Sequence, residues 1–347
     1  MKNIYFAAPI THHTSYGIVA LNITEQLAKR GDINLSIGPI GGTPTYDPFL
    51  PEQNLTHLHN KELDGEIISI VLFHQGMLSQ HHHPKATKRI GFPIFELDGF
   101  SQKELEDLQF QDEFFVCSQW AKDVIQKHFP TKPVHVVPLG YNPKLYQFLD
   151  EPVNKYENRT VFLNVGKWEY RKCHDKLAHI FRRAFSKIDN VLLLMCPTNF
   201  FIGQQENDRL KNEYKSILGD QVHFYDRLES QKDIADVQKL SFASIQISHS
   251  EGWGLPAFES MVLGKPTILT NYGGYTEFAN DYNSCLVRIH DLEPANDGLW
   301  FHGQHNWAAI GEDQIFQTIQ YLKFIHKDFQ ANGARNFSQI HNSVKHL

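Results

Sequence analysis

The sequence contains no apolar run that approaches the ~20 residues needed to cross a bilayer. Its start, Met1–Phe6, enters a short apolar run and lacks the hydrophobic region and cleavage site of a signal peptide. We therefore expect no transmembrane segment and a cytoplasmic location. Peripheral contact with a membrane stays open.

Cysteine is scarce. Cys117, Cys173, Cys196 and Cys285 are the only four, and no two of them have CxxC spacing. Cys117 and Cys196 lie in or beside apolar runs, where a small buried thiol is common. We interpret all four as reduced, structural residues.

A surplus of positive charge is also missing. The net charge is −6, and residues 1–150 carry 12 Lys and Arg against 16 Asp and Glu, while the remainder carries 21 against 23. Non-specific binding of nucleic acid relies on a strong basic field. Neither half of the chain has such a field, although a local basic patch is compatible with these numbers.

Metal ligands are not grouped in the sequence. No Asp-x-Asp triplet occurs, and His81–His83 is the one dense group among 20 histidines. This triplet is either a metal patch or an exposed polar loop. The loop is favoured because no further ligand is spaced to complete a site. We expect neither a metal nor a cofactor.

What the chain does contain is a regular alternation of apolar strands and amphipathic helices. Its 347 residues are too many for one ordinary core, and 41% of them are hydrophobic, which is typical of globular domains. Strand–helix alternation predicts parallel sheets with helices on both faces. The expected strands are 3–8, 33–37, 67–73, 114–117, 134–138, 160–165, 191–195, 222–224, 243–247 and 266–270. The expected helices are 17–29, 119–128, 174–186, 207–217, 232–240 and 256–263.

The alternation breaks at 150–159, a polar stretch without apolar periodicity. We therefore predict an α/β protein of two doubly wound domains, 1–150 and 151–324, with the ligand site in a cleft between them. A polar helical tail of about 325–347 can pack back on the first domain.

The stretch Ser248–Met261 carries the clearest chemical pattern, because it follows a strand and opens a helix. Pro256 suits the first helical turn, and Gly264 suits the end of the helix. Gly252 and Gly254 allow the backbone to approach a ligand, and the helix N-terminus favours an anion.

Two carboxylates flank this predicted anion site. Glu251 precedes the helix and Glu259 lies just past its first turn. Carboxylates beside an anion are favourable when they accept hydrogen bonds from hydroxyl groups, as a sugar and a ribose would supply. The pattern therefore indicates a diphosphate between two polyols. The alternative is an ordinary glycine loop with two solvated carboxylates.

Glu251–Met261, together with Gly264-Lys265-Pro266 and Asn271–Glu277, resembles the signature of glycosyltransferase family 4. The members of that family are retaining enzymes of the GT-B fold, with two Rossmann-like domains. The resemblance implies that Glu251 faces the transferred sugar and Glu259 the donor ribose. It also places Gly252, Trp253, Gly254 and Leu255 at the donor.

A second segment, Phe162–Lys172, resembles the opening of the family's second domain. By that resemblance Gly166 and Arg171 bind the donor, and Lys167 and Lys172 hold its diphosphate. Lys167 stands where Arg is more common and Cys173 where Gly is common. A lysine keeps the charge but loses bidentate geometry.

Three first-domain positions complete the predicted site. The loop Thr14–Gly17, and Gly17 in particular, resembles the family's small-residue loop near the donor phosphate. His74 ends a buried strand at a position that the family places near the cleft, and we include it among the catalytic candidates. Glu96, in Phe95-Glu96-Leu97-Asp98, resembles an acceptor-side acid, although the proline that usually follows is absent.

The resemblance implies transfer of a sugar from a UDP- or GDP-sugar to a hydroxyl acceptor, with retention of configuration. Lysines would neutralise the leaving diphosphate without a metal. Two other classes stay open. One is a sugar-nucleotide epimerase or glycan phosphorylase of the same fold, and the other is a non-catalytic binder of nucleotide sugars.

Overall fold

The computed structural model describes residues 1–149, 156 and 159–332. Contacts divide the chain into two compact units. The first contains residues 1–142 and the short segment 229–232. The second contains 143–228 and the described residues from 233 onward. Most of the linker predicted at 150–159, and residues 333–347 of the predicted C-terminal tail, lie outside the described residues.

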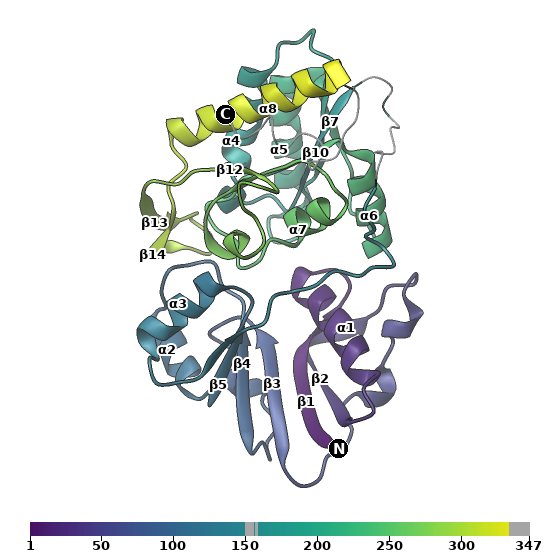
Figure 1. The fold of residues 1–347 in the computed structure, drawn as a ribbon, viewed down its shortest axis with the longest axis vertical. Helices are drawn as coiled ribbons and strands as arrows, with labels where there is room; N and C mark the ends of the chain where they lie inside the picture. Colours follow the sequence, from purple (N-terminus) through teal and green to yellow (C-terminus); the bar gives the residue numbers. More distant parts are fainter. Residues whose placement is uncertain (150–155, 157–158, 333–347) are drawn as a thin grey trace. The chain divides into compact units, whose positions relative to one another are not determined.

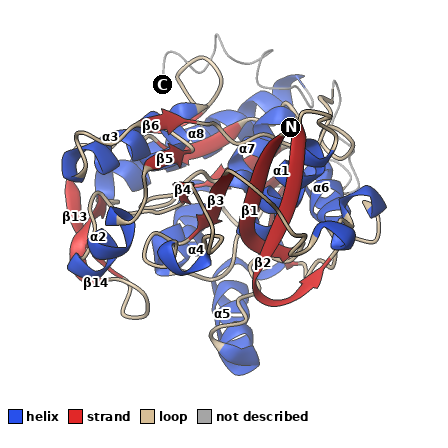
Figure 2. Ribbon diagram, turned by 90° about the horizontal axis from the view of Figure 1, so that it is seen from below, coloured by secondary structure: helices blue, strands red, loops and turns tan. Residues whose placement is uncertain are grey.

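The first unit is a parallel six-stranded sheet in the order β2-β1-β3-β4-β5-β6. Its central strands β1 and β3 are mostly apolar and bury five residues each, as expected of parallel strands covered on both faces. Helix α1 lies beside β1 in both views of the molecule (Figures 1 and 2). The strands are β1 (Lys2–Thr11), β2 (Ile33–Thr45), β3 (Ile67–Phe73), β4 (Lys88–Pro93), β5 (Glu113–Val116) and β6 (Val134–Val136), and the helices are α1 (Ser15–Ala28), α2 (Gln102–Gln109) and α3 (Gln119–His128).

The second unit repeats this architecture, with its strands in the order β12-β11-β10-β7-β8-β9. Its core includes Phe162 from β7 and Phe181 from α4. The strands are β7 (Thr160–Val165), β8 (Val191–Cys196), β9 (Val222–Phe224), β10 (Ala243–Gln246), β11 (Thr267–Thr270) and β12 (Cys285–Val287), and an antiparallel hairpin joins β13 (Leu292–Asn296) to β14 (His302–Ala308). The helices are α4 (His174–Ala184), α5 (Gly203–Leu218), α6 (Gln231–Leu240, of which 233–240 belong to this unit), α7 (Leu255–Val262) and α8 (Glu312–Asn332).

Helix α8 packs along α4 in the second unit, where it is the yellow helix of Figure 1. Leu322 and Ile325 enter the core of this unit, and His326 Nδ1 lies 2.7 Å from Thr160 Oγ1. The described part of the predicted tail, 325–332, therefore contacts the second unit.

The predicted alternation of strands and helices is present, and several elements lie outside the prediction. The sequence pattern does not signal β4, α2, β12 or the β13–β14 hairpin. Helix α2 is short and buries only Leu108, and Ser101 and Glu104 form a capping box at its start. Strand β2 continues to Thr45 through a glycine-rich stretch, because its backbone keeps pairing with β1 as far as Thr11.

Candidate active site

In the second unit, the loops that follow β7, β10 and β11 leave the same edge of the sheet. These strands are parallel and adjacent, so their carboxyl ends lie together. The loop after β7 runs through 166–172 and ends in a short 3₁₀ turn, Tyr170–Lys172. The loop after β10 carries Glu251. The sequence-predicted donor segments therefore meet at one edge.

Glycines allow two of these loops to touch backbone to backbone. Gly274 donates its N–H to the carbonyl of Glu251 at 2.8 Å. A Cβ on Gly274 would lie 2.1 Å from the carbonyl oxygen of Gly252. Gly254 has a φ of +90°, and a Cβ there would lie 2.1 Å from the ring of Tyr275. Side chains at either position would separate the loops.

Helix α7 begins at Leu255, directly after Gly254, and has Pro256 in its first turn. It ends before Gly264, whose φ of +78° is the left-handed conformation expected of a glycine after a helix. The helix predicted at 256–263 is thus present with bounds shifted by one residue.

Two of the predicted basic residues, Arg171 and Lys172, converge on Glu251. Lys172 crosses Gly166 so closely that a Cβ on this glycine would lie 2.9 Å from Lys172 Cδ. Its ammonium then reaches Glu251 Oε1 at 2.5 Å. Arg171 Nη1 contacts the same carboxylate oxygen at 2.9 Å.

A second carboxylate, Glu169, binds the other side of this basic group. Its Oε1 lies 2.8 Å from Lys167 Nζ and its Oε2 accepts from Arg171 Nη2 at 2.8 Å. Lys167 also lies over the ring of Phe201, 4.8 Å from its centroid. Together three cations face two carboxylates, an arrangement that leaves one positive charge for an anionic ligand.

Both acids stay ionised despite burial. Burial acts to raise the pKa of Glu169, but Arg171, Lys172 and Lys167 outweigh it and bring that pKa down to about 2. Burial likewise opposes ionisation of Glu251, whose pKa nevertheless lies below its ordinary value because Arg171 and Lys172 are close.

Two buried histidines support these loops as neutral side chains. His174 Nδ1 accepts from the Glu169 N–H at 3.1 Å, so its Nε2 donates to Asn164 Oδ1 at 2.9 Å. His249 Nδ1 donates to the carbonyl of Ala308 at 2.8 Å. Burial is the main reason that the pKa falls to about 3 for His174 and about 4 for His249.

Glu259 lies on α7 and is buried in a different environment. Gln238 donates to its Oε2 at 3.3 Å, and Tyr146 also bonds its side chain. Burial raises the pKa of Glu259 to about 7, while both hydrogen bonds act to lower it. Its protonation therefore changes near neutral pH.

Two polar side-chain atoms in the signature loop, residues 248–254, have no hydrogen-bond partner among the described residues. Ser250 Oγ and Trp253 Nε1 are buried without a hydrogen bond in the described part of the chain. Buried polar groups are normally bonded. The Trp253 ring packs against Phe258 and Phe278, and Leu255 is also buried.

The three first-unit candidates also gather at one sheet edge. Gly17, His74 and Glu96 follow β1, β3 and β4, which are adjacent and parallel. A Cβ on Gly17 would lie 1.9 Å from the Thr11 carbonyl oxygen, so glycine lets α1 approach β1. His74 is exposed and its Nδ1 accepts from the Gly76 N–H at 3.3 Å. Glu96 is partly exposed in the segment between β4 and α2.

The sequence predicts reduced, structural cysteines and an exposed polar loop at His81–His83. All four cysteines are free thiols. His82 is not a solvated loop residue, because its ring nitrogens contact Ser69 Oγ at 2.9 Å and Gln111 Oε1 at 2.6 Å. Among the described residues, no three His, Cys, Asp or Glu side chains are grouped to hold a metal ion. None of the described helices has the length and apolarity to cross a membrane.

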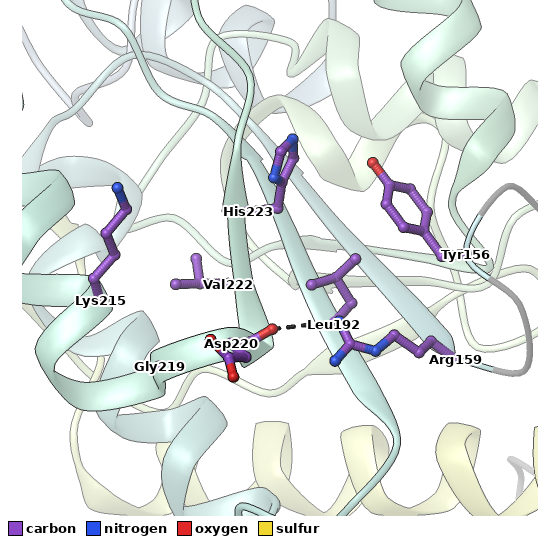
Figure 3. A pocket seen from close by; sticks show the side chains of 8 residues that line it. All are labelled: Tyr156, Arg159, Leu192, Lys215, Gly219, Asp220, Val222 and His223. Carbon is purple, nitrogen blue, oxygen red and sulfur yellow. Dashed lines mark hydrogen bonds between the residues drawn. The ribbon is translucent and has the colours of Figure 1, made fainter.

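A separate pocket of about 440 Å³ opens near the start of β8 and β9 (Figure 3). Its rim holds the Arg159 guanidinium, which donates to the Asp220 carbonyl at 3.3 Å. The lining residues are Tyr156, Arg159, Leu192, Lys215, Gly219, Asp220, Val222 and His223. This pocket lies at the amino ends of the strands, away from the loops that carry Lys172 and Glu251.

Sequence reasoning missed three residues of the site. Glu169 lies within the predicted basic turn, where its spacing from Lys167 and Arg171 was a usable signal. Tyr146 and Gln238 contact Glu259 from segments far away in the sequence. No local pattern indicates such contacts.

Similarity to known proteins concerns part of the sequence and the fold of the whole chain. A family model described as "Glycosyl transferases group 1" matches residues 146–311. The structure of HepE from Anabaena, in complex with UDP and glucose, has a TM-score of 0.67 at 15% identity, covering 99% of this chain and 95% of that one. The structure of WaaG, a glycosyltransferase involved in lipopolysaccharide biosynthesis, has a TM-score of 0.64 at 14% identity, covering 99% and 94%.

A third solved structure, that of the lipopolysaccharide outer core galactosyltransferase WaaB, has a TM-score of 0.64 at 13% identity, again covering 99% of this chain and 94% of that one. No curated protein matches the chain by sequence. At such low identities the likeness concerns the fold. It confirms the predicted class of two Rossmann-like α/β units of the GT-B type.

Proposed function

We propose that this chain is a retaining glycosyltransferase, on the premise that its residues 146–311 match the family model of glycosyl transferases group 1. It moves a hexosyl or pentosyl group from a UDP- or GDP-sugar to a hydroxyl acceptor, in the synthesis of a glycan or glycoconjugate. The solved relatives bound to UDP and glucose, or acting in lipopolysaccharide synthesis, support this substrate class. A cytoplasmic location is part of the proposal.

One observation carries the proposal. Arg171 and Lys172 converge on Glu251, in the loop that precedes the N-terminus of α7. Lys167 joins this group through Glu169, which it shares with Arg171. Such a group of cations next to peptide N–H groups suits a diphosphate. A carboxylate at the same point suits the hydroxyls of the attached sugar.

The chemistry follows from where charge develops. Cleavage of the sugar–phosphate bond leaves negative charge on the diphosphate and positive charge on the sugar. Lys167, Lys172 and the amides around Gly252 and Gly254 stabilise the leaving diphosphate. The acceptor attacks from the face that the diphosphate leaves, and the leaving phosphate takes the acceptor's proton.

The remaining site residues take positions along the donor and acceptor. Glu251 bonds the transferred sugar and Glu259 the ribose, and Trp253 and Leu255 line the donor. Gly166 and Arg171 shape the donor loop, with Arg171 acting mainly through the carboxylate of Glu251. From the first unit, Gly17 approaches the donor phosphate, His74 the reacting sugar and Glu96 the acceptor. No cofactor or metal takes part.

A panel of nucleoside diphosphate sugars tests the proposal. A donor at 100 times its Kd should stabilise the chain by about 2.7 kcal/mol, which a thermal-shift assay detects. The best donor is then incubated with sugar acceptors, and the anomeric configuration of the product is read by NMR. Glu251→Gln, which keeps the size of the side chain and removes its charge, is the negative control and should show impaired transfer.

Each competing class gives its own outcome. An altered sugar nucleotide formed without an acceptor would identify an epimerase. Dependence on free phosphate would identify a phosphorylase. Binding of a donor without transfer or hydrolysis across the acceptor panel would leave a non-catalytic binding protein.

A further inference from the structure

Glu169 is a buried acid within the basic turn, and nothing above requires it as a ligand of the donor. Its carboxylate lies 2.8 Å from both Lys167 Nζ and Arg171 Nη2, and only 7% of its side chain is exposed. Its own backbone is fixed, because the Glu169 N–H donates to buried His174. The carboxylate is therefore a fixed anchor for the two cations.

Arg171, which Glu169 holds, binds the signature loop, residues 248–254, through both its side chain and its backbone carbonyl. Its Nη1 donates to the Ser250 carbonyl at 2.5 Å and contacts Glu251 Oε1 at 2.9 Å. Its backbone carbonyl accepts from the His249 N–H at 2.7 Å and from Ser248 Oγ at 2.9 Å. Hence the position of the loop that carries Glu251 depends on the position of Arg171.

We propose that Glu169 is a positioning residue for sugar transfer: it orients Arg171, and through Arg171 it places the Glu251 carboxylate at the sugar. This inference rests on the proposed function of the same site. Glu169 itself does not touch the donor.

The physical reason is a competition for partners. Glu251 Oε1 is shared by Arg171 and Lys172. Without Glu169, Arg171 would have Glu251 as its carboxylate partner in this network and would turn toward it, displacing Lys172. With Glu169 ionised, one guanidinium nitrogen binds each acid, and the fork of Arg171 has a single orientation. Because the pKa of Glu169 is about 2, this anchor stays charged at every working pH.

A second role for Glu169 would have the opposite effect. Glu169 could hold Lys167 away from the diphosphate and so compete with the donor. Removing its charge would then free Lys167 and strengthen the binding of nucleoside diphosphate. The two roles therefore predict different changes in kcat and in binding.

The experiment compares Glu169→Gln with wild type in the full chain, using the nucleotide sugar found in the panel. We expect kcat to fall ~10-fold or more, as for a misplaced reacting group, while the Kd of the bare nucleoside diphosphate changes less than ~3-fold by calorimetry. Glu169→Asp, which keeps the charge on a shorter side chain, should recover part of the loss. Glu206→Gln removes an exposed acid paired to Arg209 on α5 and is the matched control.

A double-mutant cycle identifies the route. If Glu169 acts through Arg171, Glu169→Gln should add almost nothing in an Arg171→Met or a Glu251→Gln background. Two background variants are used so that the test can still be made in one of them if circular dichroism shows that the other folds poorly. A full additional loss in both backgrounds would overturn the proposed route.

Other outcomes also overturn the inference. These are unchanged kcat in Glu169→Gln, tighter binding of nucleoside diphosphate by that variant, and a loss explained entirely by a lower folded fraction. If wild type transfers no sugar from any donor, the proposed function fails together with this inference. If wild type transfers normally and Glu169→Gln does too, only the positioning role fails.

Discussion

Lys172 and Glu251 lie 79 positions apart in the sequence, and their side chains meet at 2.5 Å. The pair joins the loop after β7 to the loop after β10. Glu251 neutralises the lysine that we assign to the diphosphate. A bound donor would supply a second acceptor for the same ammonium.

Replacing Lys172 should impair transfer strongly. Lys172→Ala removes one preorganised charge from the leaving diphosphate, so kcat/KM should fall ~10²-fold or more. Steady-state kinetics with the identified donor measures this, and Lys167→Ala should behave similarly. Lys187→Ala, an exposed lysine between α4 and β8, serves as the control. A folded Lys172→Ala variant with near-normal activity would contradict the assignment.

Replacing Glu251 and replacing Glu259 should have different effects on the affinity for nucleoside diphosphate. Glu259→Ala should weaken bare nucleoside diphosphate as well as donor, because the ribose belongs to both. Glu251→Ala should damage transfer and leave affinity for the bare diphosphate almost unchanged. A hydrogen bond to a charged group contributes ~1.5–3 kcal/mol, which calorimetry resolves. Loss of nucleotide binding in Glu251→Ala alone would mean that the donor lies in the reverse direction.

Binding of the nucleotide should depend on pH through Glu259. Burial raises the pKa of this carboxyl to about 7, so the acid is mostly protonated at pH 6 and mostly ionised at pH 8. Ribose hydroxyls donate best to the ionised form, so affinity should rise across this interval. Calorimetry of wild type and Glu259→Gln at both pH values isolates the effect from titration of the phosphate. Equal pH dependence in the two proteins would refute this role.

Glu259 should also make the free energy of unfolding decrease as the pH rises. Since its pKa is raised on folding, the folded state binds the proton more tightly than the unfolded chain. Stability should therefore fall as pH rises from the ordinary carboxyl range to about 7. Urea unfolding of Glu259→Gln should show a smaller decrease over this range than wild type.

Transfer should not require a divalent metal. The diphosphate site that we propose uses Lys167 and Lys172, and the sequence has no Asp-x-Asp triplet. Activity should survive excess EDTA in a discontinuous product assay. Complete loss that returns on addition of Mg²⁺ or Mn²⁺ would mean that the phosphate site is misassigned.

The loop after β11, which carries Gly274, touches the loop after β10, which carries Gly252, and this contact should not tolerate an added methyl group. In Gly274→Ala the new Cβ would lie 2.1 Å from the Gly252 carbonyl oxygen and 2.8 Å from Trp253 Cα, and neither backbone can yield locally. We expect a loss of ~1–3 kcal/mol in stability, measured by chemical denaturation, together with lower activity. At Gly311 the nearest atom would be Gln314 Oε1, at 3.6 Å, so Gly311→Ala is the control.

The sequence by itself determined the features that depend on neighbouring residues. Apolar runs such as Ile67–Phe73 became buried parallel strands, and Gly254, Pro256 and Gly264 set the limits of α7 through their local backbone preferences. The charged residues of the donor segments were recognisable for the same reason. Polar α2 was not recognisable, because its single buried residue leaves almost no periodic pattern.

Only the tertiary structure decided which charges meet and what each one does. Glu251 and Glu259 look equivalent as residues of one short segment, yet Arg171 and Lys172 keep the pKa of Glu251 low, while burial beside Tyr146 and Gln238 raises the pKa of Glu259 to about 7. Glu169 became an anchor because Lys167 and Arg171 turn toward it. Electrostatic interactions act across space between distant segments, so the energies that separate these acids exist only in the folded chain.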